Sequence, residues 1–158
     1  MHSIYCGTFE LQFSKMKDQT IDYALRATWQ AVSRLYNEQA AHYEGSMAIG
    51  FTLLSIDKDK GTPATEISAR MGMEATSLTR TLKTLTEKGL ITKHKNPNDG
   101  RGVLVYLTEL GKEKRELSKN TVIQFNEIIK LTVDPEKLTH FFEVTETINQ
   151  LIADKKIF

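Results

Sequence analysis

Residues 65–108 contain two short helix-like segments followed by two strand-like runs, and this order constrains the fold more than any other feature of the chain. The first segment, 65–71, is followed by Gly72, and the second segment covers 75–88. Gly72 precedes the apolar residue Met73, an arrangement typical of a left-handed helix stop, which glycine adopts without steric cost. The sequence therefore predicts two helices joined by a tight turn.

The second of these predicted helices has two distinct faces. Leu78, Leu82 and Leu85 recur with helical spacing, which predicts one buried stripe. The opposite face carries short polar and basic side chains and no acidic one: Thr76, Ser77, Thr79, Arg80 and Lys83. A helix with one apolar face and one polar, basic face suits the major groove of duplex DNA.

The two strand-like runs are 90–95 and 103–107, and a polar segment, 96–102, joins them. The turn-forming residues of that segment predict a hairpin. Alternation in the second run predicts one buried face, formed by Val103, Val105 and Leu107. Two helices followed by such a hairpin predict a winged helix-turn-helix.

Long helical patterns flank this part of the chain. The first begins at Asp18 or Thr20 and extends to Tyr43, and Ser46 can cap a shorter helix over 47–56. Pro63 restricts residues 62–64 to a short edge segment, because proline lacks a backbone donor. Thr65 is expected to cap the helix that follows it.

After the hairpin, Thr108 is expected to cap a helix from Glu109 to about Leu131, and Asp134 precedes a last helix with Pro135 at its first position. The predicted fold class is therefore mainly α with a small β wing. We expect an N-terminal arm at 1–17 and a single domain at 18–158. Its winged part covers 46–108, and its helical parts cover 18–44 and 109–158.

The helical parts have more apolar positions than a compact winged module can cover. A second copy of the chain is the expected cover, which would give a two-fold dimer. The alternative is a self-contained monomeric core.

Charge is distributed unevenly along a chain whose net charge is only +1. Between Arg80 and Arg101 there are six basic residues and two acidic ones, a local charge of +4. From Asp134 to the end there are five acidic residues and three lysines, a local charge of −2. A basic cluster on the predicted helix face and hairpin is typical of phosphate binding, although such clusters are also common on solvated surfaces.

From Met71 to Thr108 the chain resembles the MarR family of bacterial transcription regulators. The resemblance depends on Leu78-Thr79-Arg80, on the helix exit Glu87-Lys88-Gly89-Leu90-Ile91, and on a wing motif. The wing motif Asp-x-Arg-x-x-x-Val-x-Leu-Thr is matched by Asp99, Arg101, Val105, Leu107 and Thr108. Glu74 departs from the family pattern, since an Asp or Ser cap is usual there. The flanking helices extend the resemblance from about residue 18 to the C-terminus.

The resemblance implies a homodimer that binds a pseudo-palindromic duplex, with repression as the default outcome. In such a complex we expect the short polar side chains and Arg80 to face the base edges, with a phosphate contact as the alternative for Arg80. Lys83, Lys93 and Lys95 are expected mostly to contact phosphates. The resemblance further implies that Asp99 positions Arg101 and that Arg101 enters the minor groove. The alternative for Asp99 is an ordinary turn carboxylate.

The family also implies a small-molecule effector that changes DNA affinity. Four aromatic residues are candidates for lining its pocket: Trp29, Tyr36, Phe51 and Phe125. Ordinary core or dimer packing is the alternative role for each of them.

Other classes of function have weaker support in the sequence. Neither a glycine-rich phosphate loop nor a catalytic triad context is present, and the four histidines lack metal-ligand spacing, so we expect no enzyme, cofactor or metal site. A redox- or metal-responsive family member is an alternative, although Cys6 is expected to be incidental. A winged-helix module for protein–protein contacts is another. We expect a cytoplasmic protein, because no secretory signal pattern or membrane-length apolar run occurs.

Overall fold

The computed structural model describes residues 20–97 and 99–157, with the backbone alone for residues 99–101. The chain forms two compact units, of which one ends at Ile49 and the other begins at Gly50. The predicted N-terminal arm lies outside the described residues, and the proposed division into domains remains a prediction.

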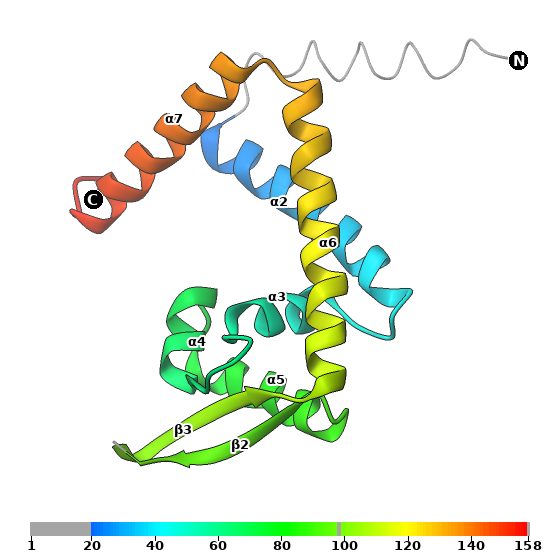
Figure 1. The fold of residues 1–158 in the computed structure, drawn as a ribbon. Helices are drawn as coiled ribbons and strands as arrows, with labels where there is room; N and C mark the ends of the chain where they lie inside the picture. Colours follow the sequence, from blue (N-terminus) through cyan, green and yellow to red (C-terminus); the bar gives the residue numbers. More distant parts are fainter. Residues whose placement is uncertain (1–19, 98, 158) are drawn as a thin grey trace, which may run out of the picture. The chain divides into compact units, whose positions relative to one another are not determined.

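The first unit contains helix α2 (Ile21–Ala41) and the start of helix α3 (Met47–Ser55) (Figure 1). Between them the chain turns at Gly45, whose amide donates to the Ala40 carbonyl at 2.9 Å. Two side chains bind the first amides of α3. The Asn37 Oδ1 atom accepts from Met47 at 3.0 Å, and the Ser46 hydroxyl accepts from Ile49 at 3.3 Å. The predicted cap at Ser46 is therefore confirmed.

In the second unit, three antiparallel strands form a small sheet in the order β1-β3-β2. These strands are β1 (Thr62–Pro63), β2 (Ile91–Asn96) and β3 (Asp99–Leu107). Thr62 pairs with Val105 and Pro63 with Leu104, so the proline lies on an edge strand as predicted. In Figure 1 the β2–β3 hairpin runs below α5 and α4, which contact β2 and β3 respectively.

Helix α4 (Ala64–Met71) and helix α5 (Ala75–Glu87) precede the hairpin. Gly72 ends α4 with φ of 58°, which confirms the predicted left-handed stop. The predicted cap at Thr65 is wrong: Pro63 occupies the cap position, and Thr65 lies inside the helix. The fixed φ of proline is compatible with a residue that leads directly from β1 into a helix.

The core of the second unit lies where α3, α4, α5 and the sheet meet. Its buried apolar side chains come from all of these elements: Leu53, Ile56, Ile67, Leu78, Leu82, Leu85, Leu90, Ile91 and Val105. The leucine stripe predicted for α5 is thus confirmed. It orients the helix so that its other side is exposed.

The hairpin differs from its prediction in two respects. Strand β3 begins at Asp99 rather than at residue 103, so the predicted polar segment between the strands is mostly strand. Val103 was expected to be buried with Val105, but its side chain is 37% exposed whereas that of Val105 is 0% exposed. The reason is that β1 pairs with β3 only at Leu104 and Val105, so the hairpin projects beyond the core from Val103 outward.

Helix α6 (Glu109–Thr132) and helix α7 (Pro135–Ala153) complete the second unit. Thr108 caps α6 as predicted, and α7 begins with Pro135 at its first position as predicted, with Asp134 as its cap. Helix α7 has no buried residue, and it exposes large apolar side chains, among them Phe141, Phe142 and Ile152. Within the described part of the chain, none of the helices has the length and apolar character needed to cross a membrane.

Candidate nucleic-acid interface

The outer face of α5 is the centre of the candidate site. Its polar and basic side chains are all exposed, as the leucine stripe on the inner face requires: Thr76, Ser77, Thr79, Arg80 and Lys83. The Thr79 hydroxyl donates to the Ala75 carbonyl at 2.8 Å, so its proton is used within the helix and its oxygen can still accept a hydrogen bond. Among the described residues, no carboxylate forms an ion pair with Arg80, whereas Lys83 lies 3.8 Å from Glu87. Both members of that pair are well exposed, so it holds Lys83 only weakly.

The first turn of α5 carries no acidic side chain, and the cap residue Glu74 makes no side-chain hydrogen bond to the helix. This agrees with the expectation that Glu74 is a poor cap. The positive end of the helix dipole is therefore not offset by a capping carboxylate. Ser68 of α4 holds the preceding turn, because its hydroxyl donates to the Met73 carbonyl.

Strand β2 contributes a second set of cations. Lys93 pairs with Val105 and Lys95 with Val103, and both lysines are exposed. Because directly paired residues share a face, the two lysines lie on the face of the hairpin that also carries the buried Val105. They therefore lie on the same face of the sheet as the helical core.

The hairpin register is interrupted where the wing motif lies. Lys95 pairs with Val103 and Asn96 with Asp99, so residues 100–102 have no directly paired partner in β2. Arg101 is the middle residue of this irregular segment and has a glycine on each side. Such irregularities redirect the chain and are common beside functional sites. The structure describes the backbone of Asp99 and Arg101, and their proposed roles remain predictions.

His94 of this hairpin has no role predicted from the sequence. Its ring meets the ring of Tyr106 edge-on, with 5.2 Å between centroids, and its Nε2 atom lies 3.3 Å from the Thr92 hydroxyl. His94 and Tyr106 lie on the face opposite the lysines, because the strand alternates. The Tyr106 ring also approaches Gly61, where an added Cβ would lie 2.3 Å from its Cζ atom. These contacts fix the base of the hairpin.

Two arginines behind the site also had no role in the sequence analysis. Arg70 of α4 donates from Nη1 to the Ser55 carbonyl at 2.8 Å, and Arg115 of α6 donates from Nε to the Ile56 carbonyl at 3.3 Å. Both guanidinium groups thus bind carbonyls at the C-terminal end of α3, where cations are favourable. Arg115 is 59 residues from its acceptor, so no local pattern indicated this contact.

The four candidate effector-pocket residues belong to two different units. Trp29 is 55% exposed, while Tyr36 is buried, and both are in α2. Burial raises the pKa of the Tyr36 phenol. Phe51 of α3 and Phe125 of α6 are half-buried in the second unit. Their grouping around an effector remains a prediction.

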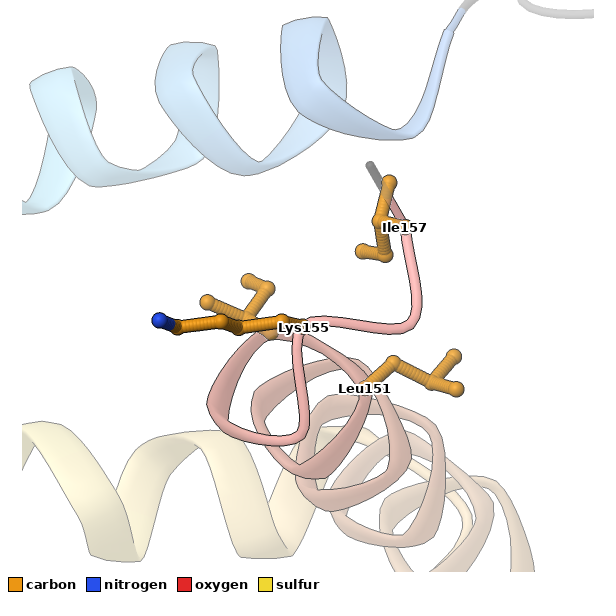
Figure 2. A pocket seen from close by; sticks show the side chains of 4 residues that line it. Leu151, Lys155 and Ile157 are labelled. Atoms are coloured by element: carbon orange, nitrogen blue, oxygen red, sulfur yellow. The ribbon is translucent and has the colours of Figure 1, made fainter.

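A hollow at the C-terminal end of α7 is lined by a different set of side chains. Leu151, Ile152, Lys155 and Ile157 surround it, and Figure 2 shows three of them by name. The lining is aliphatic apart from one lysine, and it contains none of the predicted effector residues. Among the described residues, no group of three or more His, Cys, Asp or Glu side chains could hold a metal ion.

Comparison with known proteins agrees with this arrangement. Residues 46–103 match the model of the MarR family. The HTH-type transcriptional regulator BilQ of Clostridioides difficile is 26% identical over 121 residues, which are 76% of this chain and 81% of BilQ. The relatives of the chain are named as transcription regulators and not as enzymes, as the sequence analysis expected.

Solved structures show the same fold. A mutant MarR from E. coli complexed with operator DNA superposes with a TM-score of 0.72 at 25% identity, covering 81% of this chain and 92% of that one. PcaV from Streptomyces coelicolor, in complex with its natural ligand, has a TM-score of 0.73 at 19% identity, covering 84% of this chain and 93% of that one. The predicted winged helix-turn-helix with flanking helices is therefore confirmed.

Proposed function

Since the chain belongs to the MarR family of winged helix-turn-helix transcription regulators, we propose that it acts as a homodimeric, sequence-specific repressor controlled by a small effector. One observation carries this proposal. The buried leucine stripe of α5 leaves Arg80 and the hydroxyl-bearing residues exposed together on one helix face. That combination suits the major groove, because bidentate arginine contacts and hydroxyl groups read base edges there.

The lysines of the site serve a different purpose in this proposal. Lys83, Lys93 and Lys95 bind phosphates and fix the register of the protein on the duplex. Arg101 enters the minor groove beside them, where narrow A·T-rich tracts attract arginine. The structure of a related MarR with operator DNA supports duplex DNA as the partner.

Dimerisation follows from the apolar surface of the helical parts. Among the described residues, helices α2, α6 and α7 each expose large apolar side chains. A two-fold pairing buries them and places two copies of α5 on one side of the duplex, about one helical turn apart. Such spacing requires a pseudo-palindromic site.

Trp29 and Tyr36, both in α2, are proposed to take part in binding the effector. The related PcaV was solved with its natural ligand, which supports a ligand-controlled mechanism. Trp29 is the only tryptophan of the chain, so its fluorescence reports on one place. A set of small aromatic acids should contain at least one that shifts this fluorescence and weakens DNA binding. The effector proposal fails if no compound in a broad screen changes DNA release.

DNA binding itself is tested in two steps with the full chain. Salt titration on a random duplex should give a linear fall of log affinity with log salt, with a slope of about −0.9 per phosphate contact. Selection from a random duplex pool should then enrich a pseudo-palindromic sequence. As a matched control, Lys130→Ala removes an exposed lysine of α6 that pairs with Glu127 and should leave the slope unchanged. A wild-type protein that ignores duplexes at low salt would instead support a module for protein–protein contacts.

A further inference from the structure

The C-terminal end of α5 and the start of α6 are joined by a compact set of backbone contacts. After Glu87 the chain turns through Gly89, which has φ of 67°. The turn is closed by the Leu90 amide, which donates to the Leu85 carbonyl at 2.9 Å. The carbonyls of Gly89 and Leu90 then accept hydrogen bonds from the residue that begins α6.

That residue is Thr108, which makes two hydrogen bonds across this junction and a third that caps α6. Its amide donates to the Leu90 carbonyl at 3.0 Å, and its hydroxyl donates to the Gly89 carbonyl at 2.7 Å. The same hydroxyl oxygen accepts from the Gly111 amide at 3.0 Å, which caps α6. The Thr108 hydroxyl therefore caps α6 as an acceptor and binds the turn after α5 as a donor. A side chain at this position must supply both a donor and an acceptor.

Gly111 shows how closely the two segments approach each other. A Cβ atom added at Gly111 would lie 2.0 Å from the Leu90 carbonyl oxygen, a distance that real Cβ contacts do not reach. The first turn of α6 thus packs directly on the backbone that ends α5. This leaves little room for α6 to tilt or rotate without moving the end of α5.

We propose that Thr108 is a positioning residue for DNA recognition, which sets the orientation of α5 relative to α6. The inference rests on the proposed function, because it assigns to Thr108 the coupling between the DNA-reading helix and the helices proposed to form the dimer. Thr108 acts through α5 and has no need to touch DNA. Helix α6 has 24 residues, so a small change of its direction becomes a large displacement at its far end.

The test compares affinities for two duplexes of equal length: the sequence selected from the random pool and an unrelated one. Thr108→Val removes both hydrogen bonds of the hydroxyl, Thr108→Ser keeps both, and Thr108→Asp keeps an acceptor for the cap but cannot donate to Gly89. Each variant is measured as the full chain, well below its own unfolding midpoint. Because Thr108→Asp is an effective helix cap, it provides a folded variant if Thr108→Val does not fold.

Thr108→Val and Thr108→Asp should lose roughly 2- to 30-fold more affinity for the selected duplex than for the unrelated one, the range for couplings through residues away from the contact surface. Thr108→Ser should match the wild type on both. A loss of equal factor on both duplexes would mean a general effect of stability or charge, and it would overturn the proposal, as would unchanged binding by Thr108→Asp. Wild-type protein that binds neither duplex would overturn the proposed function, and the role of Thr108 with it.

Discussion

Arg80 and Lys93 are both exposed cations of the candidate interface, but the backbone presents them differently. Arg80 projects from the outer face of a helix whose inner face is locked by Leu78 and Leu82. Lys93 projects from strand β2, in which its sequence neighbours Thr92 and His94 are also exposed. A helix in the major groove brings its side chains to base edges, whereas a hairpin beside it meets the backbone of the duplex.

This difference predicts two kinds of binding defect. Arg80→Ala should cost about 1–3 kcal/mol of binding free energy and relax sequence preference at one position of the site. Lys93→Ala should weaken binding to all sequences alike and reduce the salt slope by about 1. Competition binding with single-base variants of the selected duplex measures both. Equal losses on every duplex for Arg80→Ala would reassign this residue to phosphate binding.

Asp57, in the turn after α3, is a residue whose contribution to stability depends on pH. Its Oδ1 atom accepts from the amides of Asp59 and Lys60, both at 2.9 Å. The amide of Asp59, followed by that of Lys60, holds the pKa of the Asp57 carboxyl below its usual value. Because the folded-state pKa is lowered, the stabilisation is fully present above the unfolded-state pKa and is lost as pH falls through the folded-state pKa.

Asp57→Asn should therefore be less stable than the wild type near neutral pH, and the two should converge below about pH 4. Urea unfolding at a series of pH values measures the difference. A stability difference for Asp57→Asn that does not change with pH would rule out the charge as its cause.

At the scale of elements, several boundaries are set by local chemistry that the sequence shows directly. The cap of α6 at Thr108, the start of α7 at Pro135 and the left-handed stop at Gly72 all occur where they were predicted. Each boundary depends on residues within a few positions of one another, so the local sequence is enough to predict it. The junction of α5 with α6 is different, because Gly111 contacts a carbonyl 21 positions earlier in the chain.

Gly111→Ala should destabilise the fold by at least about 2 kcal/mol, because the added methyl group meets backbone and has no side chain to displace. Helix propensity favours alanine over glycine, so propensity alone would predict that Gly111→Ala stabilises the fold, whereas we expect it to destabilise the fold. Urea denaturation gives the change in free energy of unfolding. Glu113→Ala, at an exposed position of the same helix, should stay within about 0.5 kcal/mol of the wild type. A more stable Gly111→Ala variant would contradict the close approach at the junction.

At the scale of the whole molecule, the apolar surface of α7 is the feature that a single chain leaves unexplained. Phe141 is 53% exposed and Phe142 is 62% exposed, although their rings contact each other with centroids 5.4 Å apart. Large apolar side chains in such a row mark interaction surfaces in proteins that are otherwise polar outside. The proposed dimer accounts for them.

Phe142→Glu should shift the protein from dimer toward monomer in sedimentation equilibrium, because it places a charge in an apolar interface. It should also reduce affinity for the selected palindromic duplex far more than for a random one. The reason is that a dimer binds the two half-sites together, whereas each monomer binds one half-site independently. Glu143→Lys changes the charge of the same helix at an exposed position on the side away from the apolar stripe and is the control. A Phe142→Glu variant that remains dimeric would exclude this face from the interface.

The sequence by itself determined the elements of this protein and the character of the α5 face. The helical spacing of Leu78, Leu82 and Leu85 and the caps at Ser46 and Thr108 are short-range patterns, so they were predictable without any structure, although the cap expected at Thr65 was not formed. The tertiary structure alone decided which predicted strand positions are buried, as the exposure of Val103 shows. It also placed Arg115 on the end of α3 and brought Thr108 and Gly111 against the end of α5. These contacts join residues far apart in the chain, and packing rather than local spacing selects them.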